Sequence, residues 1–278
     1  MPHNAPPLAI IGFGNMGSAI VRGVLATGLL TPDRMVIAEP DGAKCAGLAR
    51  VHATALGALK ALHELESTGD GQQGQILLAV KPQKLAIAAE GLEEVVGDRI
   101  VISILAGTPS SKVREMLGGR ARVVRAMPNL PASVGQGATA LAIGEGATVA
   151  DRAFARRLFT GIGPLVLDVE EKMMDAFTAL AGSGPAYLFY LAESMTHAAK
   201  AMGFSPEHAT AAVRQTLVGA AAMLAHGAKS PAELRAAVTS KGGTTAAAMT
   251  VLDDHHVAQH IESAVMAART RSEELGKL

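Results

Sequence analysis

The first 169 residues alternate short apolar runs with segments of helical spacing. Runs rich in Val, Ile and Leu, each typical of a buried strand, span residues 8–12, 35–38, 76–80, 100–105 and 122–126. Alternation of strand and helix predicts an α/β fold with a doubly wound, mostly parallel sheet. Two further runs, at 138–144 and 164–169, flank a helical segment at about 151–160 and are expected to extend the same sheet.

The strand pattern stops after Asp168. Residues 170–278 are rich in Ala, Met and Leu at helical spacing, and GSGP, GFSPEH, HGAKSP and SKGG interrupt them. The change of pattern predicts two domains, an α/β domain at 1–169 and an all-helical domain at 170–278. Helices with so few bulky side chains are expected to pack closely and to complete their core against a second subunit. We therefore expect a dimer, with a self-contained helical bundle as the alternative.

Composition excludes several classes of partner. The 278 residues carry a formal net charge of zero, 3% aromatic residues and no Trp. Such a chain lacks the basic surface and the stacking platforms that nucleic-acid binding uses. No apolar stretch approaches the ~20 residues of a membrane span, and the start of the sequence has no secretory leader pattern. A single cysteine excludes an internal disulfide and a multi-thiolate metal site. We expect a cytoplasmic protein.

The segment LAIIGFGNMG, residues 8–17, carries the most specific chemistry. It leads an apolar strand into a glycine-spaced turn and then into a helix predicted at 15–26. Gly12 permits the tight turn, Gly14 lets a pyrophosphate approach the backbone, and Gly17 lets the helix pack on the sheet. The free N–H groups at the helix start favour phosphate. The pattern predicts a Rossmann-type dinucleotide site, and a purely structural glycine turn is the alternative.

Glu39 bears on the choice of cofactor. It ends the strand MVIA, 22 residues after Gly17. An acidic residue at this place binds the ribose hydroxyls and disfavours a 2′-phosphate, which favours NADH over NADPH. Alternatively, Glu39 is a surface residue of the turn EPDG, and Asp41 caps the next helix.

A second glycine-rich helix start lies near the C-terminus. Gly242 and Gly243 precede two threonines and an Ala-rich helix. Free N–H groups there, joined by the hydroxyls of Ser240, Thr244 and Thr245, are suited to hold a small carboxylate. The alternative is that Thr244 or Thr245 only caps the helix.

The run VTSKGGTTAAAMTVLD, 238–253, closely resembles the C-terminal signature of the pyrroline-5-carboxylate reductase family. AGSGPAY, AVKP and RAMPN (residues 181–187, 79–82 and 125–129) also resemble that family's segments, in the family's order. The resemblance covers nearly the whole chain. It implies a Rossmann domain, a helical dimerisation domain, and reduction of 1-pyrroline-5-carboxylate to proline with NADPH or NADH. It also implies a homodimer through the C-terminal helices, which a higher oligomer of dimers could contain.

The resemblance also assigns site residues. The cofactor would be lined by Ile11, Gly12, Phe13, Gly14, Asn15, Met16, Gly17, Glu39, Ala79, Val80, Lys81, Pro82 and Ala106. The substrate would bind between Glu171, Ser240, Gly243, Thr244 and Thr245, with Asn129 nearby. Glu39 stands where members that favour NADPH tend to carry a small hydroxyl residue. One departure is Lys241, which stands where the family usually has proline; it attracts the substrate carboxylate or is simply solvated.

The chemistry fits this resemblance. Hydride transfer from the nicotinamide C4 to an imine carbon needs orientation, a carboxylate anchor and a donor to the imine nitrogen. It needs no nucleophile and no metal. Thr245 is the candidate catalytic residue, because its hydroxyl is suited to hydrogen-bond the ring nitrogen that becomes an amine.

Competing hypotheses rest on other residues. A β-hydroxyacid dehydrogenase would place a catalytic lysine on the helix after GSG, where this chain has none before Lys200. A catalytically silent nucleotide-binding protein is the second alternative. His255, His256 and His260 suggest a metal site, but no Asp or Glu completes a convincing one. Cys45 is expected to be a packing residue within the second helix of the nucleotide fold.

Overall fold

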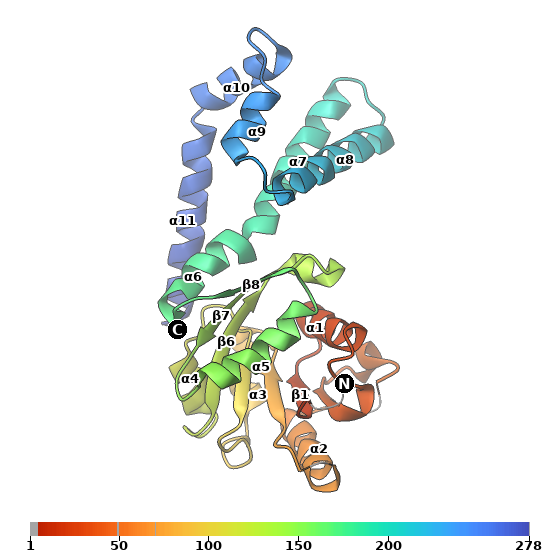
Figure 1. Cartoon of the computed structure of the whole chain (residues 1–278), viewed down its shortest axis with the longest axis vertical. Helices are drawn as coiled ribbons and strands as arrows, with labels where there is room; N and C mark the ends of the chain where they lie inside the picture. Colours follow the sequence, from red (N-terminus) through yellow and green to blue (C-terminus); the bar gives the residue numbers. More distant parts are fainter. Residues whose placement is uncertain (1–4, 49, 70, 278) are drawn as a thin grey trace. The chain divides into compact units, whose positions relative to one another are not determined.

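The computed structural model describes residues 5–48, 50–69 and 71–277 (Figure 1). Its internal contacts divide the chain into two compact units. The sheet unit comprises Met1–Ser183 and Ala268–Leu278, and the helical unit comprises Gly184–Ala267. The predicted boundary after residue 169 marks where the strand pattern ends and stays a prediction about domains. By contacts, residues 170–183 and the end of the chain pack with the sheet.

The sheet has the order β3-β2-β1-β4-β5-β6-β7-β8, and only the β6–β7 pair is antiparallel among the strands described. The predicted mostly parallel, doubly wound sheet is confirmed. The strands are β1 Leu8–Ile11, β2 Met35–Ala38, β3 Val51–His52, β4 Gln75–Leu78, β5 Ile100–Ser103, β6 Arg122–Pro128, β7 Ala138–Ile143 and β8 Leu165–Asp168. The sequence analysis missed β3, because two residues are too short to show a period.

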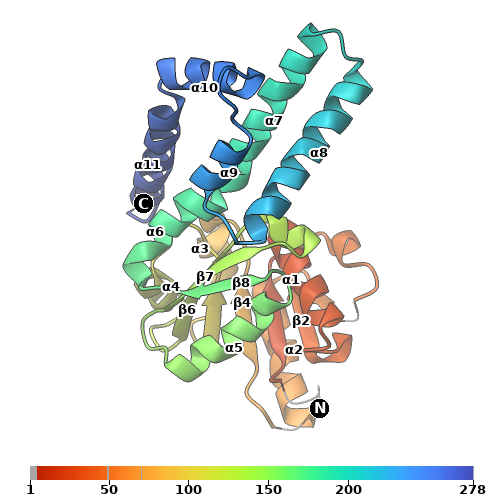
Figure 2. The ribbon, with the colours of Figure 1, turned by 45° about the horizontal axis from the view of Figure 1, so that its top comes forward.

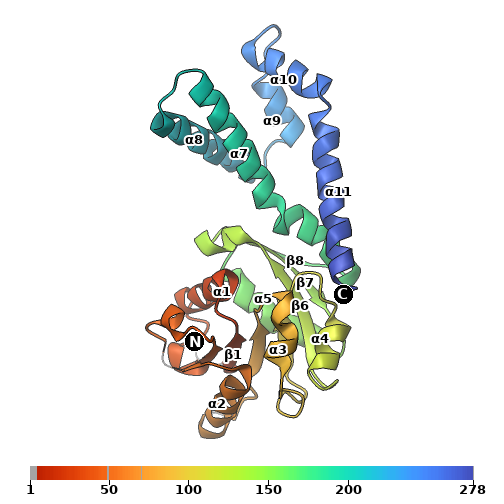
Figure 3. The ribbon, with the colours of Figure 1, turned by 180° about the vertical axis from the view of Figure 1, so that it is seen from behind.

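Helices cover both faces of this sheet. They are α1 Asn15–Ala26, α2 Ala55–Thr68, α3 Leu85–Ala89, α4 Ser110–Met116 and α5 Val149–Thr160, with α1 as predicted. After β8 come a 3-10 turn at Glu171–Met173, α6 Met174–Phe177 and a π-helical turn at Thr178–Gly182. Further 3-10 turns span Pro32–Arg34, Gly42–Cys45, Pro82–Lys84 and Leu130–Val134. α1 and α5 contact each other on one face (Figure 1), and α3 and α4 lie on the other (Figure 3).

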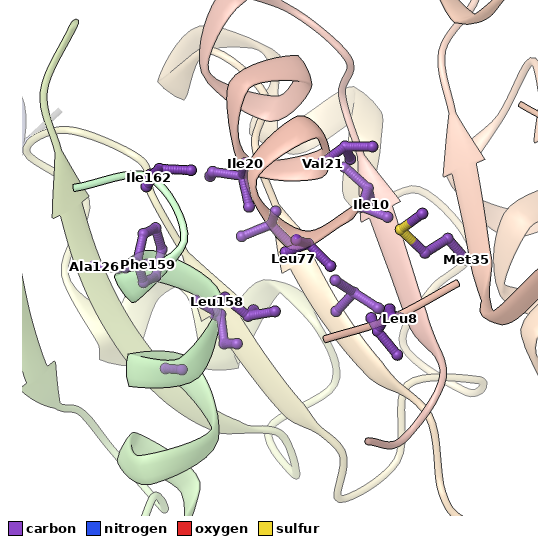
Figure 4. Close-up of a cluster of buried hydrophobic side chains, with 14 of the residues drawn as sticks. Leu8, Ile10, Ile20, Val21, Met35, Leu77, Ala126, Leu158, Phe159 and Ile162 are labelled. Carbon is purple, nitrogen blue, oxygen red and sulfur yellow. The ribbon is translucent and has the colours of Figure 1, made fainter. Parts of the chain in front are cut away.

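Alternate residues of β1 belong to two different apolar cores, one on each face of the sheet. Leu8 and Ile10 belong to the cluster beneath α1 and α5, which also contains Ile20 and Phe159 (Figure 4). Ala9 and Ile11 instead belong to the cluster beneath α2, α3 and α4. All four residues of β1 are buried, so the strand lies between two apolar layers.

The predicted second helix around Cys45 is wrong. The segment forms only the 3-10 turn Gly42–Cys45, and the second long helix, α2, begins at Ala55 with Thr54 as its cap. Gly47, two residues after this turn, has a φ of +85°, which does not continue a helix, and β3 begins at Val51. Cys45 is nevertheless buried, as predicted. Burial, and then the nearby carboxylates of Glu39 and Asp41, raise the pKa of its thiol.

The helical unit contains α7 Gly184–Ala201, α8 Pro206–Ala225, α9 Pro231–Ala237, α10 Thr244–Asp254 and the first part of α11 Val257–Leu275 (Figure 2). α7 and α8 pack against each other. Ser205 caps α8, and Ser230 and Glu233 form a capping box on α9. The hydroxyl and then the backbone N–H of Ser230 lower the pKa of Glu233. Within the described residues, no helix is long and apolar enough to cross a bilayer.

The helical unit has almost no core of its own. Within this unit, the buried apolar residues are Ala199, Ala209 and Val213. Its bulky side chains are exposed instead: Leu188, Phe189, Tyr190, Leu191, Met202, Phe204, Val218, Met223, Leu224, Val238, Val251, Leu252, Ile261 and Met266. Exposed apolar area on this scale is typical of interaction sites.

A buried ion pair ties α2 to the sheet. The Arg99 guanidinium donates to both carboxylate oxygens of Glu66, at 2.7 and 2.9 Å from Nη2, and to the carbonyls of Val95 and Val96. The same carboxylate accepts the N–H of Gly74 at 2.6 Å. The Arg99 side chain is 7% exposed and that of Glu66 is 16% exposed. Because little water reaches them, each charge is stabilised by the other.

Removing one partner should therefore be costly. We expect Glu66→Ala to lower the free energy of unfolding by about 3 kcal/mol, because it leaves a buried cation without its carboxylate. Glu170→Ala, which breaks the exposed Glu170–Lys172 pair, should leave the free energy of unfolding nearly unchanged. Urea unfolding of both variants measures the difference. Equal losses of unfolding free energy in the two variants would contradict a stabilising role of the Glu66–Arg99 pair.

Candidate active site

The glycine turn lies where the direction of strand order reverses. β1 is flanked by β2 and β4, and this is the point at which open parallel sheets form a crevice beyond their carboxyl ends. Gly12 has a φ of +99°, and a Cβ there would lie 2.7 Å from the carbonyl oxygen of Ala79. A Cβ on Gly17 would overlap the carbonyl of Gly12. The turn is therefore closed against both β4 and its own helix.

Gly14 differs from these two glycines. A Cβ there would meet nothing within 4 Å, so the space beside its backbone is open. Gly14 is also the N-cap of α1, in extended conformation and without a side-chain hydrogen bond. The first turn of α1 carries no acidic residue. The N-terminus of α1 thus offers uncapped N–H groups and the positive end of the helix dipole to an anion.

The loops that follow β4 and β5 are next to the glycine turn, because β4 pairs with β1 and β5 pairs with β4. Ala79 follows β4, and its N–H donates to the carbonyl of Ile11 at 2.8 Å. Val80 is half-buried and Lys81 exposed, and Pro82 opens a 3-10 turn. Ala106, half-buried, belongs to the loop that follows β5, the neighbour of β4.

Glu39 is held at the glycine turn. Its Oε2 accepts the N–H of Phe13 at 3.1 Å, and its Oε1 accepts the N–H of Asp41 at 3.2 Å. Lys44 Nζ lies 3.4 Å from the same Oε1 and 3.4 Å from Asp41 Oδ2; Asp41, and then Glu39, raise the pKa of Lys44. The Glu39 side chain is 11% exposed, unlike a solvated turn residue. The side chain of Asp41 caps no helix.

Glu171 has protein partners for its carboxylate. Oε1 accepts the N–H of Ser110 at 2.8 Å and Nη1 of Arg125 at 3.2 Å, and Oε2 accepts the Ser110 hydroxyl at 2.6 Å. Ser110 is the first residue of α4, and Arg125 is buried within β6. The sequence analysis did not identify Ser110 or Arg125. A charge inside the apolar strand VVRAM was the available signal for Arg125.

Asn129 is buried, and both the nitrogen and the oxygen of its side-chain amide form hydrogen bonds. Nδ2 donates to the carbonyl of Ala181 at 3.1 Å, and Oδ1 accepts the N–H of Ala138 at 2.9 Å. It thus connects the end of β6 to the start of β7 and to the π-helical turn. The roles of Glu171 and Asn129 toward a substrate stay predictions.

The segment 240–245 forms the N-terminus of α10 in the helical unit. Gly243 is the N-cap, and no side chain caps the helix. The alternative that Thr244 or Thr245 serves as the cap is therefore wrong: they are the first two helical residues. Within the described residues, their hydroxyls and that of Ser240 have no hydrogen-bond partner. Lys241 is exposed, and Thr245 is half-buried.

The structure thus groups the predicted residues into two sets. The cofactor residues, Glu171 and Asn129 belong to the sheet unit, and Ser240, Gly243, Thr244 and Thr245 belong to the helical unit. In the parts of the chain that are described, no three His, Cys, Asp or Glu side chains are grouped to hold a metal ion.

Comparisons with known proteins agree with the resemblance. A family model described as pyrroline-5-carboxylate reductase dimerisation matches residues 171–275. A second, described as NADP oxidoreductase coenzyme F420-dependent, matches residues 7–107. The pyrroline-5-carboxylate reductase of Methanosarcina acetivorans is 35% identical over 97% of this chain and 98% of its own length. The pyrroline-5-carboxylate reductase of Arabidopsis thaliana is 34% identical over 100% of this chain and 98% of its own length.

Solved structures give the same result. The Plasmodium falciparum pyrroline carboxylate reductase, crystallised with NADP bound, superposes with a TM-score of 0.85 at 25% identity, covering 99% of each chain. The Coxiella burnetii pyrroline-5-carboxylate reductase superposes with a TM-score of 0.84 at 33% identity, covering 99% of this chain and all of its own. Identity above 30% across nearly the full length of several relatives shows that this chain belongs to the pyrroline-5-carboxylate reductase family.

Proposed function

We propose that this protein reduces L-1-pyrroline-5-carboxylate to L-proline with NADH or NADPH, as the last step of proline biosynthesis. The observation that carries this proposal is an uncapped helix start at the sheet's switch point, in a chain of this family. A second, hydroxyl-rich helix start supports it, because that start is suited to bind a small carboxylate.

The residues present fit a nicotinamide dinucleotide. The open space at Gly14 and the N–H groups of α1 would hold the pyrophosphate, and Glu39 would bind the adenine ribose. Ala79, Val80, Lys81, Pro82 and Ala106 would line the nicotinamide side. When bound, the reduced nicotinamide supplies the hydride that the imine carbon accepts.

The substrate would be oriented by the residues at the start of α10. The N–H groups of Thr244 and Thr245 and the hydroxyl of Ser240 would bind its carboxylate, since none has a partner in the described chain. The Thr245 hydroxyl would hydrogen-bond the ring nitrogen and hold a proton there as the imine becomes an amine. The side chains of Glu171 and Asn129 are bound within the sheet unit, and a role of either residue toward the substrate is part of this proposal.

Glu39 supports NADH as the preferred cofactor. Its carboxylate would lie at the ribose, where a 2′-phosphate would meet a like charge. Against this, one matching family model and one similar structure are described with NADP. We therefore propose a preference and not exclusive use of NADH.

The exposed apolar side chains of the helical unit support a homodimer. Leu188, Phe189, Tyr190 and Leu191 are each between 47% and 74% exposed and follow one another on α7. Burying such a surface against a second copy would supply the core that the unit lacks. The dimer and a cytoplasmic location, which the single buried cysteine supports, are both proposals.

The dehydrogenase alternative lacks its catalytic group. On α7, the only lysine is Lys200, in the last turn of the helix. No observation favours alcohol oxidation over imine reduction.

The direct test follows NADH and NADPH oxidation in parallel with pyrroline-5-carboxylate at matched concentrations. We expect turnover with both cofactors, a higher kcat/KM with NADH, and proline as the product. Activity on a 3-hydroxy acid without activity on the cyclic imine would reject the proposed function.

Thr245→Ala should lower kcat within or below the ~10²- to 10⁴-fold range that a positioned proton donor contributes. The Kd for NADH should remain nearly unchanged, because Thr245 belongs to the substrate end of the site. Thr245→Ser, which keeps the hydroxyl, is the matched control and should retain most of the turnover. Wild-type turnover in Thr245→Ala would remove this residue from the mechanism.

Glu39→Ser should shift the ratio of kcat/KM toward NADPH by about tenfold, equivalent to about 1.4 kcal/mol, because it removes the carboxylate that faces the 2′ position. Asp41→Asn is the control, because it neutralises an exposed neighbouring acid whose side chain pairs with Lys44. If both variants shift the ratio equally, general surface charge and not Glu39 sets the preference.

A further inference from the structure

The end of the chain packs on the loop that follows β5. α11 runs from Val257 to Leu275, and its last turns belong to the sheet unit and not to the helical unit. Figure 1 shows the end of α11 beside α6. The predicted function assigns no role to this segment.

Two glycines make the contact. Gly107 is buried with a φ of +67°, and a Cβ on Gly276 would lie 2.6 Å from its carbonyl oxygen. A Cβ on Gly107 would lie 3.0 Å from Leu275 Cβ and 3.0 Å from the carbonyl oxygen of Ser272. The two backbones therefore touch directly. Because neither glycine has a side chain, the contact buries little apolar area and contributes little hydrophobic stabilisation; its effect is to fix a distance.

A buried hydroxyl anchors the same segment. The Ser272 side chain donates to Asp175 Oδ1 at 2.6 Å, and Ser272 is only 4% exposed. Asp175 belongs to α6. The end of α11 is thus held on α6 by one strong, charge-assisted bond and is pressed against the Gly107 loop by its final turn.

The loop itself has few restraints of its own. Within Ile104–Thr108, Leu105 donates to Ser103 Oγ at 3.4 Å, and Thr108 donates to Leu105 and Ala106 at 3.5 and 3.4 Å. These lengths are at the limit of hydrogen bonding. The shorter bond from Ile104 to Leu78, at 3.1 Å, fixes only the loop's beginning. The position of Ala106 and Gly107 therefore depends on what packs over them.

We propose that the terminal turn of α11, residues 272–277, is a positioning element that holds the Ala106–Gly107 loop against the nicotinamide end of the cofactor. This inference rests on the proposed function, which puts Ala106 beside the cofactor. Ser272 and Gly276 act through the loop and are positioning residues. A displaced loop would weaken cofactor binding and misplace the reacting atoms, since small displacements at a reacting centre have large effects on rate.

The test compares cofactor affinity in full-length variants. Gly276→Ala should raise the Kd of both NADH and NADPH by about fivefold or more, because its Cβ displaces the carbonyl of Gly107. The two Kd values should rise by the same factor, because the nicotinamide end is common to both cofactors. Fluorescence titration of each reduced cofactor, without imine substrate, measures them. Lys277→Ala, an exposed change in the same turn, is the matched control and should leave both values within about twofold of wild type.

Thermal unfolding of each variant separates positioning from stability. A purely structural role would lower Tm and leave the Kd of the folded protein unchanged, and that result in Gly276→Ala would overturn the proposal. An equal rise of Kd in Lys277→Ala would also overturn it.

A second variant tests the same contact if Gly276→Ala does not fold. Ser272→Ala removes the anchor and should also raise both Kd values, whereas Asp175→Asn keeps an acceptor oxygen and should stay closer to wild type. Affinity in Ser272→Ala equal to wild type would overturn the proposal. Because binding is measured without turnover, a wild-type protein that binds cofactor but reduces no imine would reject the proposed function and still test this inference.

Discussion

The structure depends on a close approach of backbone to backbone beside β1. Gly12 presses against Ala79 of the neighbouring strand's loop, and Gly17 presses the first turn of α1 against Gly12. Any side chain at either position would push the helix away from the sheet or the turn away from β4. The tight turn brings the uncapped N-terminus of α1 to the carboxyl edge of the sheet, beside the open space at Gly14. The packing of these glycines therefore creates the space and the free N–H groups that the proposed cofactor site needs.

Side-chain hydrogen bonds hold neighbouring elements together around β6 and β7. Glu171 joins the N-terminus of α4 to buried Arg125 of β6, and Asn129 joins β6 and β7 to the π-helical turn before α7. Each of these hydrogen bonds satisfies groups that would be costly to bury alone. Together they fix the segment through which the chain leaves the sheet. The π-helical turn, which keeps the Ala181 carbonyl available to Asn129, is of the kind that recurs at functional sites.

The helical unit follows a different principle. Two of its helices, α8 and α9, have side-chain caps, yet its bulky side chains are exposed and its buried residues are small. Caps favour these helices locally but supply no core, and most of the stability of helices in proteins comes from tertiary packing. The match of residues 171–275 to a dimerisation family model agrees with the homodimer that we propose for this surface. The residues at the start of α10, for which we propose substrate binding, belong to this unit.

The sequence alone determined the parts of this protein that follow from local periodicity and local chemistry. The spacing of apolar residues predicted α1 and the mostly parallel sheet, and glycine spacing predicted the turn at Gly12–Gly17. The prediction of a helix around Cys45 was wrong, because a short turn and the two-residue β3 are too short to show a period. Only the tertiary structure showed that Glu39 is bound to the N–H of Phe13, that Arg125 lies beneath Glu171, and that Gly276 touches Gly107. These contacts join residues far apart in the chain, and their distances are set by how helices pack on a twisted sheet, which no local pattern encodes.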